Sequence, residues 1–328
     1  MTTINNRGHH SCSSPVTSEG ISPKDPTAFA ACSGSVRGRE HQRLGKNNQD
    51  AVAISRSAAW LVAVVADGCS AGDHTEIGAH LGARWLAAWI PHLLRRDEDP
   101  ADPRTAARLG DDLARYLADL LKSFHPAGPP AGSHPGYCDP YCDPHPGYCG
   151  AGYCDPHLGY FGEDPQSAEI LSDIQNLLLF GFLVAIVGCE RTAILGVGDG
   201  LLSVNGSVVE IDPGPENAPP YLAYRLVGGS LAATVPTTPR VHFSGLTAAI
   251  DTILIATDGA RDLQARATQN LRDGAVGDVA QFEDDDRYLN NPSLLQKRLR
   301  RLGDTEGLLP DDTTIALLRR VQRLGGSI

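Results

Sequence analysis

The chain has 328 residues, of which 20% are charged and 6% are aromatic, a composition typical of a globular protein with a sizeable core. Its formal net charge of −11 argues against a nucleic-acid-binding protein, which normally presents a basic surface. The N-terminal segment lacks the apolar stretch of a secretory signal, and the longest apolar run, at 177–189, is too short to cross a bilayer. We therefore expect a cytoplasmic protein without a membrane segment, whose eight cysteines are thiols.

The chain is expected to form one domain behind an unstructured N-terminus. Residues 1–30 are rich in Ser, Thr, Pro and Gly, which predicts a disordered tail, and the domain then covers residues 31–328. Apolar runs at 50–55 and 59–67 predict two strands joined by a hairpin at Arg56-Ser57.

Two amphipathic helices are predicted next, at 75–96 and 104–124. The apolar stripe of the first consists of Ile77, Leu81, Trp85, Trp89 and Leu93. The stripe of the second consists of Leu109, Leu113, Tyr116, Leu117, Leu120 and Phe124. Thr75 is the expected N-cap of the first helix, and Pro126 is expected to end the second.

A low-complexity insert, rich in Cys, Tyr, Pro and Gly, follows at about 126–166. It repeats Gly-Tyr-Cys-Asp-Pro with variations and contains Cys138, Cys142, Cys149, Cys154, His134, His145 and His157. Cysteine and histidine at short spacing can hold zinc, but these spacings match no established zinc pattern. An expanded loop is therefore favoured over a metal site.

Strands dominate the remainder of the chain. Apolar runs at 182–188, 191–199, 201–206 and 207–212 predict a meander with a hairpin turn at Asn205-Gly206, and further strands are predicted at 240–245, 251–258 and 311–320. A helix is predicted at 293–302. Strands and helices do not alternate as they do in βαβ units. The order therefore predicts an α+β fold in which an antiparallel β-sandwich is flanked by helices.

Several predicted strands end on an acidic residue. The pairs are Asp67-Gly68, Asp199-Gly200, Asp258-Gly259 and Asp311-Asp312, and Asp50 precedes the strand at 50–55. A single Asp-Gly usually marks a turn, but this set abuts apolar strands throughout. Since Mg²⁺ and Mn²⁺ prefer a few carboxylates and water as ligands, the set predicts a shared divalent metal site.

These motifs, in this order, resemble those of the PPM-type metal-dependent protein phosphatases, the protein phosphatase 2C family. The matching stretches are NNQDAVAI, VVADGCSAG, LGVGDGLLSVNG, LIATDGARDL and DDTTIALLRR, and they span roughly residues 33–320. The resemblance implies a four-layer αββα sandwich with two Mn²⁺ or Mg²⁺ ions at one end. The ions would activate a water molecule for attack on a phosphomonoester.

The resemblance also implies roles for individual residues. Asp67 bridges both ions, the Gly68 carbonyl binds the second, and Asp258 and Asp311 hold the first. Asp199 matches an acid that, with Asp258, serves a third and looser ion. Asp67 and Asp258 are thus the candidate catalytic residues.

Three positions depart from the family pattern. Gln49 replaces a glutamate that ligates the second ion, and Gly45 replaces a phosphate-binding arginine. His41, Arg43 and Lys46 are the neighbouring candidates for phosphate binding, although lysine lacks the bidentate geometry of arginine. Cys69 replaces a histidine that acts as a general acid in eukaryotic members. REHQRLGKNNQDA also resembles a bacterial branch in which the glutamine is the norm.

The function expected from these residues is that of a protein serine/threonine phosphatase with a phosphorylated protein as substrate and a cognate kinase as a further partner. One alternative is a pseudophosphatase that binds phosphoproteins or a kinase without turnover. Another is a scaffold whose Cys/Tyr-rich insert binds metal or a partner.

Overall fold

The structure is a computed structural model that describes residues 28–125, 165–214, 219–227, 236–266, 270–271, 274–275 and 277–321. The predicted tail up to residue 27 and the predicted insert from 126 to 164 lie outside the described residues. Phe29 and Ala30, which the sequence assigns to the tail, belong to a strand, and Pro165 and Gln166 begin a helix.

Two antiparallel five-stranded sheets form the centre of the molecule. The first has the order β1-β12-β9-β6-β7, formed by Phe29–Val36, Thr313–Arg320, Thr252–Ala256, Gly200–Val204 and Ser207–Ile211. The second has the order β2-β3-β4-β5-β8, formed by Ala51–Arg56, Leu61–Gly68, Phe180–Val187, Arg191–Val197 and Arg240–Leu246. The predicted sandwich and hairpins are confirmed, and β1 is a strand that the sequence analysis missed.

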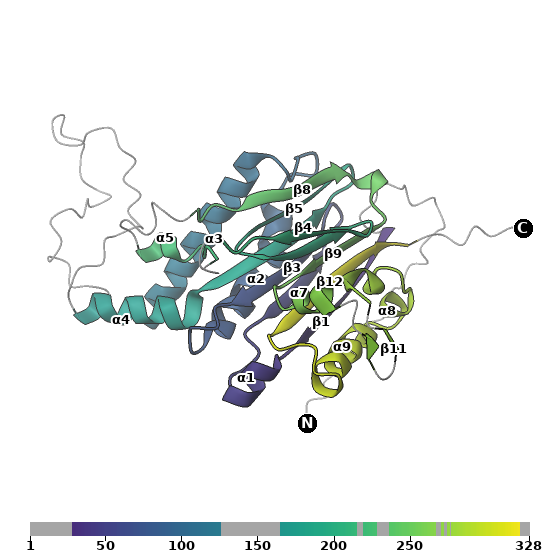
Figure 1. Cartoon of the computed structure of the whole chain (residues 1–328). Coiled ribbons are helices and arrows are strands. Elements are labelled where there is room, and N and C mark those ends of the chain that lie inside the picture. Colours follow the sequence, from purple (N-terminus) through teal and green to yellow (C-terminus); the bar gives the residue numbers. More distant parts are fainter. Residues whose placement is uncertain are drawn as a thin grey trace, which may run out of the picture.

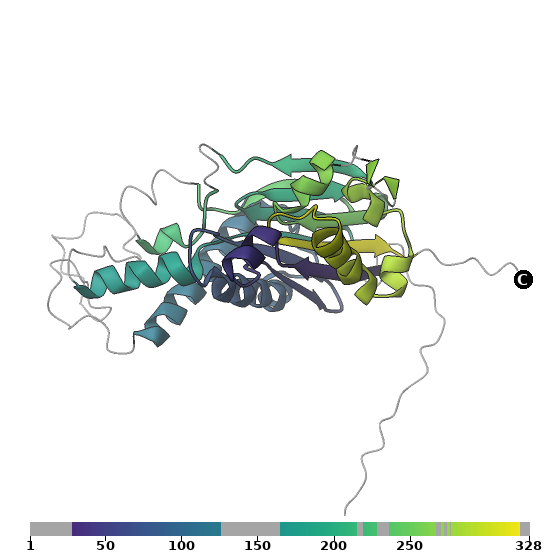
Figure 2. The same cartoon turned by 60° about the horizontal axis from the view of Figure 1, so that its bottom comes forward.

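Helices cover both outer faces, which gives the predicted four layers (Figures 1 and 2). On the β2–β8 sheet lie α2 (Thr75–Leu93) and α3 (Pro103–Phe124), and on the other sheet lie α7 (Ala260–Arg266), α8 (Arg287–Asn290) and α9 (Ser293–Arg300). The other α-helices of the described residues are α1 (Arg39–Leu44), α4 (Pro165–Asp173) and α5 (Tyr224–Val227). No helix among the described residues combines the length and the apolar composition that a membrane span requires.

The strands are apolar on both faces because each sheet is buried on both sides. In β3, Leu61, Ala63 and Val65 face the other sheet, whereas Val62, Val64 and Ala66 face α2. This alternation produces one apolar layer between the sheets and one under each helical layer.

The predicted meander is wrong at one point. β4 and β5 pair within one sheet and β6 and β7 within the other, so the chain changes sheets between Val197 and Gly200. Gly198 (φ 98°) and Gly200 (φ 138°) have backbone conformations that other residues rarely adopt, and they allow this sharp crossover at Asp199. The predicted turn at Asn205-Gly206 is confirmed, with positive φ at both residues.

The buried face of α2 also differs from the predicted stripe. Ile77 and Trp89 are each 39% exposed, and the residues that face the sheet are mainly small, namely Gly78, Ala79, Gly82 and Ala83, followed by Leu86, Ala87 and Ile90. Trp85 instead stacks on Tyr116 of α3, with ring centroids 5.2 Å apart. In α3 the predicted stripe holds except at its end, where Phe124 is exposed. Thr75 is the first helical residue rather than the N-cap, which is His74.

Candidate metal centre

Four carboxylates meet at the end of the sandwich where β3 and β9 end and β12 begins. Asp67 lies in β3, Asp258 follows β9, Asp311 precedes β12, and Asp199 lies at the crossover between the sheets. They line one cavity of about 100 Å³, here called the acidic cavity, together with His41, Gly68, Cys69, Ser70, Pro219, Tyr221 and Asp312. Residues far apart in the sequence thus deliver a concentrated negative charge to one place.

Close backbone packing fixes the strand ends that carry these acids. A Cβ atom on Gly259 would lie 2.0 Å from the Asp312 carbonyl oxygen, and one on Gly68 would lie 2.7 Å from the Gln49 carbonyl oxygen. The glycine of each Asp-Gly pair is therefore required because a neighbouring backbone segment contacts it directly.

Burial and mutual repulsion raise the pKa values of the carboxyl groups in the acidic cavity. Burial is the largest cause for each of the four aspartates. It raises the pKa of Asp258 to about 6, with Asp199 and Asp311 adding to the rise. The pKa of Asp67 lies well above its usual value because burial is reinforced by Asp50 and Asp258. A bound cation would remove this electrostatic cost, which makes the cavity a candidate site for divalent metal.

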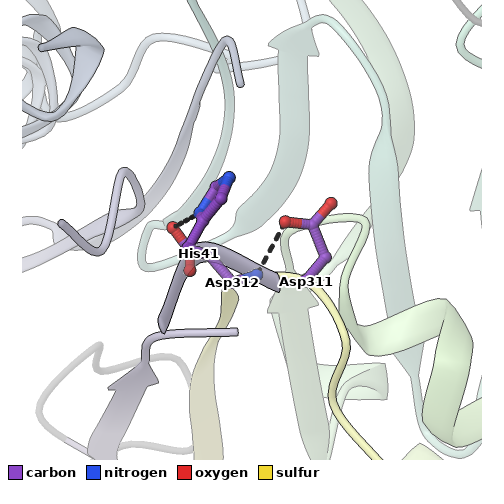
Figure 3. Close-up of side chains that lie close together, drawn as sticks. All are labelled: His41, Asp311 and Asp312. Carbon is purple, nitrogen blue, oxygen red and sulfur yellow. Dashed lines mark hydrogen bonds and ion pairs between the residues drawn. The ribbon is translucent and has the colours of Figure 1, made fainter. Parts of the chain in front are cut away.

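Asp312 also lines the cavity, but its carboxylate is already bound by neighbouring groups of the protein. Its two carboxylate oxygens accept hydrogen bonds from the backbone N–H groups of Gly38 and Gln49, each at 2.6 Å. His41 Nδ1 lies 2.8 Å from the same carboxylate (Figure 3). That contact is the main cause of the raised pKa of His41. Asp312 therefore holds α1 and the Gln49 backbone against β12.

His41, Asp311 and Asp312 form a close group. Their ligand atoms all lie within 4.8 Å of one another, a spacing that can hold a metal ion. However, the Asp312 carboxylate already accepts two backbone hydrogen bonds and contacts His41, whereas the Asp311 carboxylate accepts, within the described part of the chain, only the neighbouring N–H of Asp312, at 2.8 Å (Figure 3). Asp311 is thus the better ligand of the pair.

Gln49 and Asp50 lie behind the wall of the cavity. The Gln49 side-chain amide donates to the Gly72 carbonyl at 3.1 Å and to Thr75 Oγ1 at 2.9 Å, and its Oε1 is buried without a hydrogen-bond partner among the described residues. The buried Asp50 carboxylate accepts a hydrogen bond of 2.6 Å from Thr257 Oγ1. Neither side chain lines the acidic cavity.

The three candidates for phosphate binding have different positions. His41 lines the acidic cavity. Lys46 lines an adjoining cavity of about 390 Å³ that shares His41, Ser70 and Asp311, and its Nζ donates to the Ser70 carbonyl at 2.6 Å. Arg43 lines neither cavity, because α1 directs it to solvent, where it pairs with Glu40.

Sequence reasoning missed three residues around the cavity. Asp312 was grouped with Asp311 without a role of its own. Arg261, whose Nη1 lies 3.2 Å from Asp199 Oδ2, follows Asp258 by three residues, and its charge beside an acidic motif was a usable signal. Tyr221 lines the cavity from a segment without periodicity, and burial followed by its contact with Cys69 raises the pKa of its phenol.

One protein family and several solved structures resemble this chain. A family model described as protein phosphatase 2C matches residues 37–302. No curated protein sequence gives a significant match. Among solved structures, the chain is similar to a bacterial serine phosphatase, at 13% identity and a TM-score of 0.48 over 88% of this chain and 97% of that one.

Two further structures are similar over most of both chains. Serine/threonine phosphatase Stp1 from Staphylococcus aureus has 13% identity and a TM-score of 0.45 over 88% of this chain and 94% of that one. PppA, described as a regulatory component of T6SS in Pseudomonas aeruginosa, has 16% identity and a TM-score of 0.40 over 89% of this chain and 97% of that one.

Proposed function

Because the chain belongs to the protein phosphatase 2C family, we propose that it is a metal-dependent phosphomonoester hydrolase that removes phosphate from phosphoserine or phosphothreonine in proteins. The observation that carries the proposal is the acidic cavity, in which four strand-end carboxylates converge. We further propose that the enzyme acts in the cytoplasm.

The residues of the acidic cavity fit Mn²⁺ or Mg²⁺. Both ions prefer oxygen ligands, and Asp67, Asp258, Asp311 and the Gly68 carbonyl supply them. The backbone carbonyl and Cβ of Gln49 lie against Gly68, and its buried Oε1 has no hydrogen-bond partner among the described residues, which supports Gln49 as a neutral oxygen ligand. When bound, two such ions would supply Lewis acidity and a water molecule of lowered pKa.

The protein's own groups orient the substrate. His41 Nδ1 faces the Asp312 carboxylate, which raises the pKa of the imidazole and favours its protonated form, so that Nε2–H can donate to a phosphate oxygen. Lys46 offers a second positive charge beside the cavity, in place of the arginine that Gly45 replaces. Tyr221 and Pro219 form an apolar part of the wall and limit the access of bulk water.

Asp50 contributes from behind the cavity. Its carboxylate raises the pKa of Asp67 by repulsion, and its hydrogen bond with Thr257 ties β2 to the end of β9. We therefore assign Asp50 the task of positioning Asp258, rather than that of a direct ligand.

A second candidate function is that of a pseudophosphatase, and Gly45 favours it. Gly45 has a φ of 72° and carries no side chain, so the positive charge of the family's phosphate-binding arginine is missing at this position. In this case the acidic cavity would bind metal and a phosphoprotein, or the kinase that produces it, without turnover.

Metal titration of the purified full chain separates these functions. Hydrolysis of p-nitrophenyl phosphate and of a phosphoserine peptide is measured against Mn²⁺ concentration, and Mn²⁺ binding is measured in parallel. We expect saturable, Mn²⁺-dependent hydrolysis of both substrates. Binding of Mn²⁺ without hydrolysis indicates the pseudophosphatase, and no binding contradicts both functions.

Two variants of proposed metal ligands test the metal assignment in the same experiment. Asp67→Asn and Asp258→Asn should each lower Mn²⁺-dependent turnover by roughly 100-fold or more, because Lewis-acid stabilisation of the transition state is worth several kcal/mol. Both variants should remain folded. Asp97→Asn, whose side chain is 80% exposed and remote from the cavity, is the matched control. Near-normal turnover in either ligand variant would overturn the metal assignment.

A further inference from the structure

One carboxylate of the acidic cavity already has a cation of the protein beside it. Arg261 Nη1 lies 3.2 Å from Asp199 Oδ2, and only 5% of the Asp199 side chain is exposed. Among the described residues, this is the only ion pair between an arginine or lysine side chain and one of the four strand-end carboxylates. Asp67, Asp258 and Asp311 have no such pair within the described part of the chain.

The backbone fixes both partners of this pair. Asp199 is held at the sheet crossover between two glycines with positive φ. Arg261 lies in the first turn of α7, where its N–H donates to the Asp258 carbonyl at 2.8 Å. Its Nη2 also donates to the Ile211 carbonyl at the end of β7. The guanidinium is therefore bound on two sides, and Arg261 is not among the residues that line the cavity.

The charge of Arg261 acts on two of the cavity's carboxylates. It opposes the rise in pKa that burial causes in Asp199, and it also opposes the rise in Asp258. A guanidinium keeps its charge at all pH values at which the protein is folded, so this compensation is permanent.

We propose that Arg261 takes the place of a metal ion at Asp199, so that Asp199 is not a ligand. The acidic cavity then holds two ions and lacks the third, looser ion that Asp199 would serve with Asp258. The proposal rests on the proposed metal-dependent function, since it concerns the ions of the same cavity. Arg261 is a positioning residue: it holds Asp199 and balances its charge without touching the substrate. The ligand set then consists of Asp67, Asp258 and Asp311 with the Gly68 carbonyl and the Gln49 side-chain oxygen.

Counting bound ions tests the proposal without reference to activity. The metal-free full chain is dialysed against excess Mn²⁺, and the bound metal per chain is measured by mass spectrometry for the wild type, Arg261→Met and Arg261→Lys. We expect about two ions in the wild type. Arg261→Met removes the charged guanidinium but keeps an unbranched apolar stem, and it should bind one more ion than the wild type. Arg261→Lys keeps the charge and should match the wild type.

A double variant identifies the site of the additional ion. Arg261→Met combined with Asp199→Asn should return to the wild-type count, because the carboxylate that the extra ion needs is absent. The single variant Asp199→Asn covers the case in which Arg261→Met fails to fold. It should bind Mn²⁺ in the same number and with the same affinity as the wild type, within about twofold.

The outcomes are distinguishable. Three results would overturn the role of Arg261. The first is an equal ion count in Arg261→Met and the wild type, and the second is an extra ion that persists in the double variant. The third is the loss of an ion in Asp199→Asn. A wild type that binds no Mn²⁺ contradicts the proposed function, whereas the difference between the wild type and Arg261→Met tests this inference separately.

Discussion

At the level of single residues, the acidic cavity is marked by four buried carboxyl groups that lie close together. Its carboxylates are buried next to one another, and this shifts all four pKa values upward. The burial and mutual repulsion of these carboxyl groups favour the binding of a cation, and they therefore destabilise the metal-free protein at neutral pH.

The first prediction concerns pH. A carboxyl group with a raised folded-state pKa binds more protons in the folded than in the unfolded state, so its contribution to stability falls as pH rises through the interval between the two values. For Asp258 this interval runs from 3.8 to about 6. The loss amounts to about 3 kcal/mol. Above pH 6, metal-free Asp258→Asn should therefore be more stable than the wild type, and the difference should shrink toward pH 4.

Urea unfolding in EDTA at several pH values measures this difference. Saturating Mn²⁺ should reverse the order of the two proteins at pH 7, because the ion stabilises only the folded state that can bind it. If the metal-free wild type is more stable than metal-free Asp258→Asn at pH 7, the carboxylates of the cavity do not repel one another.

The second residue-level prediction concerns Gln49. A carboxylate there would add a full negative charge next to Gly68, and we expect Gln49→Glu to lower the half-saturating Mn²⁺ concentration about tenfold, equivalent to about 1.4 kcal/mol. The variant also loses the amide donors to Gly72 and Thr75, which should cost about 1–3 kcal/mol in the metal-free protein. The half-saturating concentration is measured from activity against Mn²⁺ concentration, and the free energy of unfolding is measured with urea in EDTA. If the activity curves of Gln49→Glu and the wild type coincide, Gln49 is not a ligand.

At the level of elements, the strand ends hold the carboxylates because adjacent backbone segments touch. β9 and β12 pair side by side, and beyond the paired residues the Thr257 N–H still donates to the Thr314 carbonyl at 3.0 Å. Asp258 and Asp311 are consequently placed by backbone rather than by flexible side-chain contacts.

The third prediction tests this packing with two glycines. Gly259→Ala should destabilise the protein by about 3 kcal/mol or more, since its Cβ would lie 2.0 Å from the Asp312 carbonyl, which is backbone and cannot move aside. Gly206→Ala is the matched control. It has positive φ in a hairpin turn with open space around it, and should cost about 1–2 kcal/mol. Thermal unfolding ranks the two, and only Gly259→Ala should also weaken Mn²⁺ binding. Equal effects would contradict the packing argument.

At the level of the whole molecule, the described residues by themselves form three buried apolar layers. The segment from 126 to 164 joins α3 to α4 and has no apolar periodicity. A segment of this composition adds little buried area to a core.

The fourth prediction follows for that segment. Replacing residues 126–164 with a short Gly/Ser linker should change the free energy of unfolding by less than about 0.5 kcal/mol. The replacement should also leave Mn²⁺-dependent turnover unaltered. A large drop in melting temperature would contradict this, as would stoichiometric zinc in the wild type that disappears with the segment.

The sequence by itself determined the long helices, the acidic strand ends and every strand of the two large sheets except β1, because local periodicity and composition encode them. It did not reveal that β5 and β6 lie in different sheets or that small residues of α2 face the sheet, since both depend on which surfaces meet. Both Asp311 and Asp312 line the cavity, and only the tertiary structure showed that the oxygens of Asp312 are already bound by the backbone N–H groups of Gly38 and Gln49. Likewise, the pairing of Arg261 with Asp199 joins residues far apart in the chain, and no local pattern specifies such a contact.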